Sequence, residues 1–345
     1  MLLSKKIAND LDAISRATAP LWRLLANSRI FITGGTGFFG KWLLFALDRA
    51  NREGAGIKIT VLSRNPRSFL RQYPELADAT GINLLEGDVR SFRFPEGEFT
   101  HVIHGATDAN ASLNSENPLL MFDTIVQGTR RVLDFAVQCR AKHFLMISSG
   151  AVYGRQPRNL PRLPEHYTGG ADIADPLSAY AEAKRAAELL AQLYLHQKEL
   201  PVIIARCFAF VGPFLNLDIH FAIGNFIRDG LAGGPIVVKG DGTTIRSYMY
   251  AADLVVWLLT ILLKGQNGAA YNVGSDEEIS IAGLAEEVSR AFPQAPEVII
   301  AGKTSPGVAP DRYVPDISLA RAELGLEVHG SLAEAIKRTV MWHTL

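Results

Sequence analysis

Three side chains in the middle of this 345-residue chain have the types and the spacing needed for acid–base chemistry. Tyr180 and Lys184 are four positions apart, so a helix would carry them on one face, one turn apart. A phenol with its ordinary pKa near 10 is a poor base at neutral pH, and a neighbouring ammonium favours the phenolate. The hydroxyl of Ser149 can supply a third hydrogen bond to the reacting oxygen. We predict that Ser149, Tyr180 and Lys184 are the catalytic residues of a hydride-transfer centre.

A glycine-rich turn in the N-terminal half supplies the context that this spacing needs, because a helix often carries a tyrosine and a lysine one turn apart by chance. The turn follows an apolar segment, residues 29–33, and leads into a helical pattern from residue 41. Gly34 allows the tight turn, Gly37 lets the backbone approach a pyrophosphate, and Gly40 lets the helix pack closely on the sheet. The sequence therefore predicts a dinucleotide site made of Gly34, Thr36, Gly37, Phe38, Phe39 and Gly40.

The end of the second predicted strand bears on the choice of cofactor. An acidic residue at this position would accept hydrogen bonds from the ribose hydroxyls of NAD. Here Ser63 is followed by Arg64, whose guanidinium suits the 2′-phosphate of NADP. Arg64 could instead stack on adenine or face solvent. We expect NADP or NAD as the cofactor, with Arg64 favouring NADP.

Small and polar residues also follow the third, fourth and fifth predicted strands. Asp88 could accept from the adenine amino group, with Val89 against the ring. Gly105, Ala106 and Thr107 would leave room for the cofactor's phosphates and ribose, and Ser148 ends the fifth strand. Carboxyl ends of parallel strands meet at one edge of a sheet, where such folds bind ligands. These residues complete the predicted cofactor site.

The alternation of short apolar runs with longer helical patterns predicts an α/β fold, a Rossmann-type doubly wound parallel sheet of about seven strands. The expected strands are residues 29–33, 58–62, 83–86, 101–104, 144–148, 202–206 and 270–273. The expected helices are residues 41–51, 119–139, 177–196, 221–232, 251–263 and 281–291.

Three regions are predicted along the chain. Residues 1–27 form a helical extension whose amphipathic stretch, 7–25, contains Pro20. Residues 28–205 form the dinucleotide-binding domain, with contributions from about 244–275. Residues 206–345, richer in Gly and Pro loops, mainly form a smaller, interleaved C-terminal lobe that binds substrate.

Composition excludes several classes of partner. The chain has 35 basic and 35 acidic residues, so no net field favours nucleic acid or an anionic membrane. Its two cysteines lack metal-ligand spacing, and we expect no metal site. The start lacks the apolar run of a signal peptide, and the longest apolar stretch, 254–263, is too short to span a membrane. We expect a soluble, cytoplasmic protein.

Taken together, these motifs make the sequence resemble an extended short-chain dehydrogenase/reductase of the nucleotide-sugar epimerase/dehydratase family. The resemblance extends from about residue 29 to 326. It rests on the glycine turn, on Asp88 with Val89, and on Ser149, Tyr180 and Lys184. The C-terminal half adds Arg206, Gly212, Pro213, Gly240, Asp241, Gly242, Arg246 and Arg312.

The resemblance implies a nucleotide-diphosphate sugar as substrate. Tyr180 would act on a sugar hydroxyl while C4 passes its hydride to the nicotinamide, Lys184 would hold the nicotinamide ribose, and Ser149 would bond O4. The implied substrate-binding residues are Asp108, Asn110, Ser149, Gly150, Asn225, Val238, Arg246 and Arg312. The family also implies a homodimer in which the helices at 119–139 and 177–196 form a four-helix bundle.

Departures from the family's patterns narrow the choice of reaction. Dehydratases place an Asp-Glu pair directly after the Ser/Thr, and uronate decarboxylases need a Glu in that segment and a further Arg near Arg312. This chain has Gly150, Ala151 and Tyr313 at those positions. We therefore expect a nucleotide-sugar 4-epimerase, in which the small pair at 150–151 leaves space for the sugar to rotate.

Other reactions remain open at this point. A 4-keto-sugar reductase would use the same three catalytic residues and consume NADPH, which Arg64 would favour. A 4,6-dehydratase, a uronate decarboxylase and a non-catalytic dinucleotide-sensing scaffold are weaker alternatives. The intact Tyr180 and Lys184 pair argues against a scaffold.

Overall fold

A single sheet of seven parallel strands organises the computed structural model, which describes residues 3–79, 81–107, 111–218, 221–303, 307 and 309–344. In spatial order the strands are β11 (Ala270–Val273), β6 (Val202–Cys207), β5 (His143–Ser149), β4 (His101–His104), β1 (Arg29–Thr33), β2 (Lys58–Ser63) and β3 (Ile82–Glu86). Every neighbouring pair is parallel. The predicted Rossmann-type sheet is confirmed, and its order changes direction between β1 and β4, where such sheets bind ligands.

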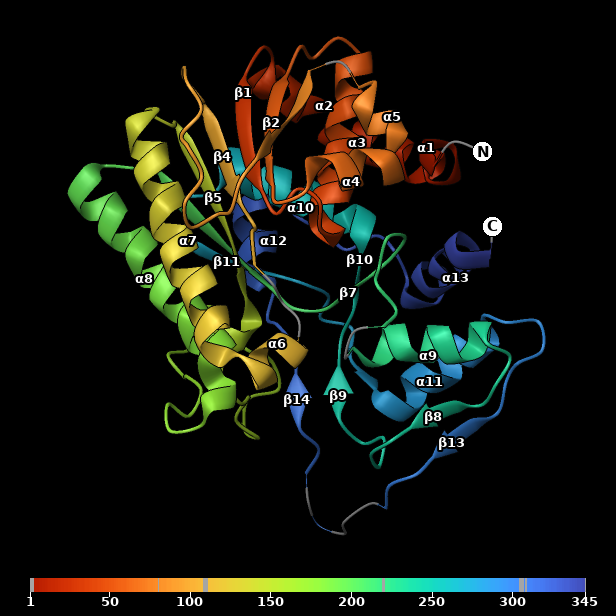
Figure 1. Ribbon diagram of the computed structural model, residues 1–345. Helices are drawn as coiled ribbons and strands as arrows, with labels where there is room; N and C mark the ends of the chain where they lie inside the picture. The colour runs from red at the N-terminus through yellow and green to blue at the C-terminus, as the bar shows by residue number, and fades with distance from the viewer. Residues whose placement is uncertain are drawn as a thin grey trace.

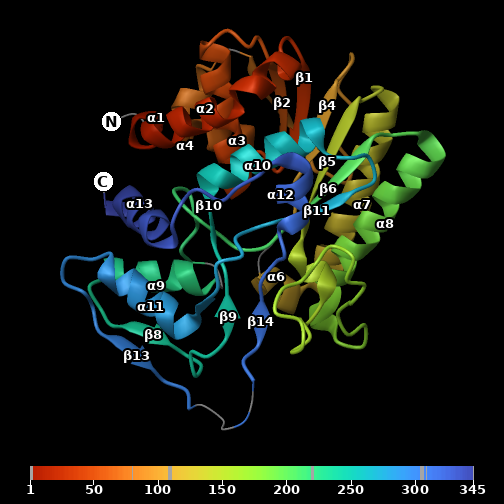
Figure 2. The same cartoon turned by 180° about the vertical axis from the view of Figure 1, so that it is seen from behind.

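Helices cover both faces of this sheet (Figures 1 and 2). On one face α7 (Pro118–Gln138) and α8 (Ala179–Lys198) lie side by side, with the short α6 (Ala111–Glu116) next to them. On the other face lie α2 (Ala8–Leu25), α3 (Phe38–Arg52) and α10 (Ala251–Lys264). The apolar run of α10 is buried between sheet and helices, as expected for a core helix.

The smaller lobe lies beyond the carboxyl ends of the central strands. Its helices are α9 (Ala222–Leu231), α11 (Ile281–Arg290) and α13 (Leu332–Thr344). One pair of short strands is β8 (Ile236–Val238) with β13 (Val298–Ile300). In a second small sheet, β9 (Ile245–Arg246) lies between β12 (Ile279–Ser280) and β14 (Arg312–Tyr313). Between lobes, β7 (Phe210–Val211) pairs with β10 (Met249–Tyr250). The chain then returns to the main sheet through α10 and β11, so the lobes interleave. The division near residue 205 remains our prediction.

The remaining elements are short. They are α1 (Leu3–Lys6), α4 (Pro66–Gln72), α5 (Pro74–Ala77), α12 (Ser318–Leu324) and the 3₁₀ turns η1 (Gly150–Tyr153) and η2 (Pro176–Ser178). Within the described residues, no helix combines the length and apolar character that crossing a membrane requires.

The N-terminal extension is an integral part of the packing. Pro20 lies inside α2, and the apolar face of α2 is buried against α3 and α10. Its buried Asp10 accepts a 2.8 Å hydrogen bond from the Tyr250 hydroxyl and pairs with Arg338 of α13. The extension therefore connects the first helix layer to the last helix of the chain.

Candidate active site

The glycine turn between β1 and α3 forms a backbone cradle that side chains would fill. Gly34 has a φ of +75°, and a Cβ there would lie 2.5 Å from the carbonyl of Gly105. A Cβ on Gly40 would lie 2.3 Å from the backbone of Gly35. The N-cap of α3 is Gly37, and no side chain caps the helix. The free N–H groups at this helix start suit a pyrophosphate.

The end of β4 lies directly beside this turn. The hydroxyl of Thr33 accepts from the Ala106 N–H at 3.1 Å and lies 2.8 Å from Nδ1 of His104. On the other side of the imidazole, Nε2 is 2.9 Å from the hydroxyl of Thr129. Burial lowers the pKa of His104 to about 3, so the ring is neutral. Sequence reasoning missed His104 because neither of its hydroxyl partners is near it in the chain.

A predicted cofactor residue, Thr107, has a buried hydroxyl without a hydrogen-bond partner among the described residues. A buried hydroxyl normally finds a partner, and the ribose or phosphate of a dinucleotide would supply one here. Together with the glycine cradle, this hydroxyl fits a bound dinucleotide.

The adenine end of the predicted site lies at the ends of β2 and β3. Ser63 is buried and its hydroxyl accepts from the Asn65 N–H at 3.3 Å. Asp88 accepts two hydrogen bonds from the Arg90 guanidinium, at 2.9 and 3.0 Å, and Arg64 is close enough to lower the pKa of Asp88 further. Val89 packs against α7, where a Cβ on Gly128 would meet it at 2.8 Å.

The three predicted catalytic residues come together where β5 faces the first turns of α8. The Ser149 hydroxyl accepts from the Ala151 N–H at 3.1 Å and lies near enough to the phenol of Tyr180 to affect its pKa. Lys184 donates to the carbonyl of Ile147 at 3.0 Å, and burial lowers its pKa to about 8.

The expected depression of the Tyr180 pKa by Lys184 is not found in this structure. Burial raises the pKa of Tyr180, because desolvation disfavours the phenolate, and the nearby Ser149 hydroxyl lowers it only in part. Lys184 instead donates to the backbone carbonyl of Ile147.

The start of α8 is held by a residue that the sequence did not suggest. Asn114 of α6 accepts from the Tyr180 N–H at 3.1 Å and donates to the Leu177 carbonyl at 2.8 Å. Its amide thereby satisfies backbone groups at the turn that precedes the predicted catalytic tyrosine.

A buried ionic cluster lies one turn further along α8. Glu188 accepts from Arg206 at 2.8 Å and from the Ser148 hydroxyl at 2.5 Å. Arg206 also donates to the Tyr153 hydroxyl at 2.9 Å. Ser148, predicted to contact the cofactor, therefore directs its hydroxyl to Glu188. The cluster joins α8 to β5 and β6 behind Lys184.

The segment after Ser149 is filled by two aromatic rings. A Cβ on Gly150 would lie 2.5 Å from the Tyr313 hydroxyl and 2.8 Å from the Phe208 ring. The prediction that the small residues leave open space beside Ser149 is therefore wrong, because the C-terminal lobe packs Tyr313 and Phe208 into it. The Ser149 hydroxyl also lies near enough to Tyr313 to affect the pKa of that phenol, which makes Tyr313 a site residue that sequence reasoning noted only as a departure from the family.

Four of the predicted substrate residues lie in the smaller lobe. Arg246 on β9 is partly buried, its guanidinium donates to the Ile245 carbonyl, and burial lowers its pKa. Arg312 on the neighbouring β14 forms a 2.6 Å ion pair with Glu278. Asn225 on α9 accepts from Arg228, and Val238 on β8 is buried. The predicted Asp108 and Asn110 lie outside the described residues.

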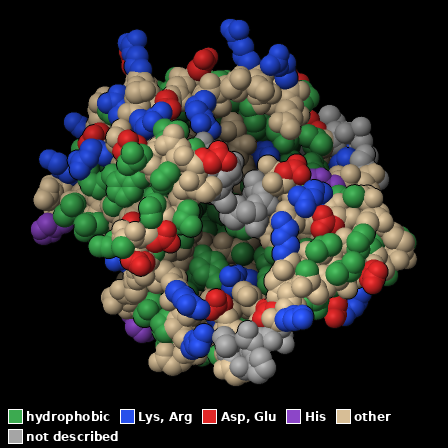
Figure 3. Space-filling model, turned by 60° about the horizontal axis from the view of Figure 1, so that its bottom comes forward, with side chains coloured by type: hydrophobic (Ala, Val, Ile, Leu, Met, Phe, Trp, Pro, Cys, Tyr) green, Lys and Arg blue, Asp and Glu red, His purple; other side chains and the backbone are tan. Residues whose placement is uncertain are grey.

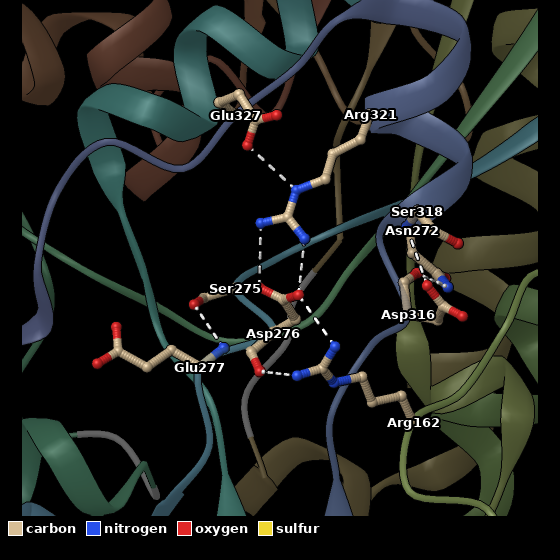
Figure 4. A network of polar contacts seen from close by, with 9 residues as sticks. All are labelled: Arg162, Asn272, Ser275, Asp276, Glu277, Asp316, Ser318, Arg321 and Glu327. Carbon is tan, nitrogen blue, oxygen red and sulfur yellow. Dashed lines mark hydrogen bonds and ion pairs between the residues drawn. The ribbon is translucent and has the colours of Figure 1, made fainter.

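A polar network surrounds Asp276 in the loop after β11 (Figure 4). Asp276, just after β11, binds Arg162 at 3.1 Å and Arg321 of α12 at 2.7 Å. Arg321 also pairs with Glu327. The network joins the loop after β11 to α12 and to the loop after η1, which are far apart in the chain.

The surface is hollowed between the two lobes (Figure 3). No group of three or more metal-ligating side chains is found within the described part of the chain.

Comparison with known proteins adds to this geometry. Residues 30–274 match the NAD dependent epimerase/dehydratase family. The chain belongs to this family. It is 31% identical over 312 residues to UDP-glucuronic acid decarboxylase 1 of Arabidopsis thaliana, covering 90% of this chain and 69% of that protein.

Solved structures of the same fold include two epimerases. The UDP-N-acetylglucosamine 4-epimerase of Methanobrevibacter ruminantium, in complex with UDP-N-acetylmuramic acid, superimposes with a TM-score of 0.80 at 21% identity, covering 92% of this chain and 99% of that one. A UDP-glucuronic acid 4-epimerase variant from Bacillus cereus, solved with a substrate analogue and NAD, gives a TM-score of 0.78 at 21% identity with the same coverage.

Family membership makes this chain an NAD(P)-dependent enzyme. The residues present fit that cofactor. Gly34, Gly37 and Thr107 offer a cradle and a hydroxyl for the dinucleotide, and Tyr180 and Lys184 lie at the carboxyl end of the same sheet.

Proposed function

We propose that this epimerase/dehydratase-family enzyme is a nucleotide-sugar 4-epimerase that works through a transient 4-keto sugar. The observation that carries the proposal is the nearness of Tyr180 to Ser149 in a centre that also contains Gly150, Ala151 and a second phenol, Tyr313. This centre can move a proton at one hydroxyl. Among the described residues around it, no carboxylate is placed to take a C5 proton or to assist loss of water.

The chain's own residues would act on the sugar oxygen. Tyr180, as phenolate, accepts the O4 proton, and Ser149 donates a hydrogen bond to O4 as negative charge develops there. A bound nicotinamide would supply the acceptor for the hydride of C4 and, after reduction, the donor that returns it. The 4-keto sugar rotates so that its other face receives the hydride. Tyr180 then returns the proton to O4 of the epimer, so neither proton nor hydride is gained or lost overall.

We further propose that Arg246 binds the diphosphate of the substrate. Its guanidinium is partly buried, and among the described residues no ion pair joins it to a carboxylate. A buried cation without a paired anion favours an anionic ligand. Arg312 and Asn225 remain proposed contacts, as do Val238 for the base and Asp108 and Asn110 for the sugar.

The relatives named as decarboxylases make decarboxylation the natural competing reaction. We do not favour it, because Ala151 and Tyr313 stand where that branch is expected to carry a Glu and an Arg. Reduction of a 4-keto sugar is the second candidate. It is favoured by one observation: Arg64, at the end of β2, suits the 2′-phosphate of NADPH.

Turnover assays on a panel of nucleotide sugars, read by NMR, test the proposal. The 4-epimer should form with no net change in cofactor redox state, whereas stoichiometric loss of NADPH with a 4-keto sugar would establish the reductase instead. Tyr180→Phe should lower turnover by about a thousandfold or more while cofactor binding persists, because general acid–base catalysis contributes about 10²–10⁴-fold. Undiminished turnover by this variant would refute the mechanism.

We also propose that two copies pair through α7 and α8. Exposed leucines lie along this face, including Leu119, Leu177, Leu189 and Leu193. Hydrophobic side chains gather on the left of the space-filling view, on the side of α7 and α8 (Figure 3). An apolar patch of this kind favours a helix-on-helix interface.

A further inference from the structure

A single side-chain amide joins α6 to the first turn of α8, and the role inferred for this contact rests on the proposed function of Tyr180. Asn114 of α6 accepts a hydrogen bond from the Tyr180 N–H through Oδ1, at 3.1 Å. Its Nδ2 donates to the carbonyl of Leu177 at 2.8 Å. Asn114 and Tyr180 are 66 residues apart in the chain, so only the tertiary structure brings them together.

The pair of backbone groups that Asn114 binds matches an amide. The Leu177 carbonyl and the Tyr180 N–H are three residues apart, where the turn η2 passes into α8. An asparagine side chain has an acceptor and a donor on one planar group, so it can bind both backbone groups at once. A carboxylate of the same size could bind only the N–H, and a leucine could bind neither. The contact therefore uses both halves of the amide.

The start of α8 needs a partner of this kind. The first four N–H groups of a helix have no acceptor within the helix. Serine is a favoured N-cap, but in the part of the chain that the structure describes the N-cap Ser178 makes no side-chain hydrogen bond to these groups. Its φ of −73° and ψ of −6° are helical, unlike the extended backbone of an ordinary N-cap. Asn114 acts instead as a cap supplied by another helix.

The short helix that carries Asn114 is itself attached to the main domain. It lies beside the end of α7 (Figures 1 and 2). Leu113 packs against the same apolar cluster as the ring of Tyr180, and its carbonyl accepts from the Asn117 N–H at 2.9 Å. Asn117 in turn caps α7, because its side chain accepts from the Leu120 N–H at 3.2 Å. Asn114 therefore projects from a fixed support.

The position of this contact connects it to the predicted chemistry. Helix α6 begins four residues after Thr107, whose buried hydroxyl is predicted to meet the cofactor. One turn beyond Tyr180, Lys184 is anchored separately, by its 3.0 Å hydrogen bond to the Ile147 carbonyl of β5. The first two turns of α8 thus have two anchors. Loss of the Asn114 anchor would free the turn that carries Tyr180 while Lys184 stays in place.

We propose that Asn114 is a positioning residue that holds the first turn of α8 and thereby places the phenol of Tyr180 relative to Ser149 and the cofactor. It acts through the backbone of Tyr180 and transfers no proton itself. Removing the amide should therefore impair the chemical step more than the binding of cofactor or sugar.

Three variants separate this role from a general effect on folding. Asn114→Leu removes both hydrogen bonds at similar size. Asn114→Asp keeps an acceptor for the Tyr180 N–H and loses the donor to Leu177. Asn117→Leu is the matched control, since this asparagine lies three positions further on and caps α7 instead.

In Asn114→Leu we expect kcat to fall about tenfold to a hundredfold, because a small displacement of a reacting group costs up to about 10²-fold. KM and the Kd of the cofactor should change less than about threefold, as expected when an interaction serves only the chemical step. Asn114→Asp should lose less of kcat than Asn114→Leu. Asn117→Leu should lower Tm, because a cap is lost, and keep the wild-type kcat.

Amide hydrogen exchange measures the contact itself without any sugar. The chain has nine tyrosines, so protein labelled on tyrosine nitrogen gives few NMR signals, and Tyr180 is the one that Tyr180→Phe removes. Exchange of the Tyr180 N–H should be about tenfold or more faster in Asn114→Leu, because local opening of the turn no longer breaks a hydrogen bond. In Asn114→Asp, which keeps the acceptor, exchange should stay near the wild-type rate.

Several outcomes would overturn the proposal. They are a wild-type kcat in Asn114→Leu, an equal loss of kcat in Asn117→Leu, or a fall in kcat matched by loss of cofactor binding, which would mean a general effect on the fold. An unchanged Tyr180 exchange rate in Asn114→Leu would also refute it. If the wild-type enzyme epimerises no nucleotide sugar, the proposed function fails, but the exchange measurement still decides whether Asn114 holds Tyr180.

Discussion

At the residue scale, the chemistry depends on which groups are near one another and on which charges are already neutralised. The phenols of Tyr180 and Tyr313 both lie near the Ser149 hydroxyl, and the Tyr313 ring packs on Phe208. The two arginines predicted to bind substrate, Arg246 and Arg312, differ in whether their charge is already neutralised. Arg312 is paired with Glu278, whereas Arg246 donates to a carbonyl. The difference decides which one can attract a diphosphate.

We predict that Arg246→Gln raises KM for the nucleotide sugar by roughly tenfold or more, because a hydrogen bond to a charged group contributes about 1.5–3 kcal/mol. Arg312→Gln is the matched control and should raise KM less than about threefold, since Glu278 already neutralises that charge. Calorimetric titration with the nucleoside diphosphate alone would check binding separately. A larger loss in the Arg312 variant would reverse the assignment.

At the element scale, the site exists because β1 and β4 end side by side and their loops lock together. Thr33 of β1 and Thr129 of α7 hold the imidazole of His104 between them. These hydrogen bonds form with the neutral imidazole, which is buried away from water. This burial of His104 also makes the fold sensitive to acid, because a buried neutral imidazole resists protonation.

We predict that the free energy of unfolding falls as pH drops below about 6.5, the ordinary histidine pKa. The unfolded imidazole of His104 binds a proton near 6.5, but the folded one does so only at about 3, so between these values the unfolded state binds more protons and stability is lost on acidification. His101, lowered to about 4, acts in the same direction.

Urea unfolding at several pH values measures this dependence. His104→Gln should remove roughly 2 kcal/mol of the loss between neutral pH and pH 5, at about 1.4 kcal/mol per unit of pKa difference. The exposed His166 provides the control variant His166→Gln, which should keep the wild-type dependence. A His104→Gln profile that follows the wild type would assign the acid sensitivity to other groups.

At the scale of the whole molecule, two interleaved lobes enclose the site and one outer face stays apolar. The chain crosses from the main sheet to the smaller lobe and back, so movement of β14 relative to β5 would be needed to separate Tyr313 from Gly150. The outer face of α7 and α8 carries exposed leucines. Contact of these apolar side chains with water is unfavourable, so their burial would stabilise a dimer.

We predict a dimer at micromolar concentration that Leu189→Glu converts to a monomer. Leu189 is 61% exposed in the single chain, so the change should spare the fold, while two buried glutamates at a symmetric interface would weaken association by about a hundredfold or more. Light scattering after gel filtration measures the mass. Leu24→Glu, on α2, is the control, since Leu24 is 56% exposed on a different face. A monomeric wild-type protein would exclude the interface.

Much of the fold could be read from the sequence because its determinants are local. All seven strands of the sheet lie within one or two residues of their predicted ends, since parallel strands buried on both faces are continuous apolar runs bounded by turn residues. The glycine turn was equally readable, because φ of +75° at Gly34 and the close approach of Gly105 exclude a side chain. Tyr180 and Lys184 share a helix, so their spacing is also local.

By itself, then, the sequence determined the sheet, the glycine turn, the family and the placing of Tyr180 and Lys184 on one helix, because strand periodicity, turn geometry and helical spacing act over a few neighbouring residues. Only the tertiary structure decided what surrounds that pair. Tyr313 and Phe208 fill the space beside Gly150, and Glu278 neutralises Arg312, through contacts between segments far apart in the chain. Such contacts depend on how the smaller lobe packs against the sheet, and no local pattern specifies that packing.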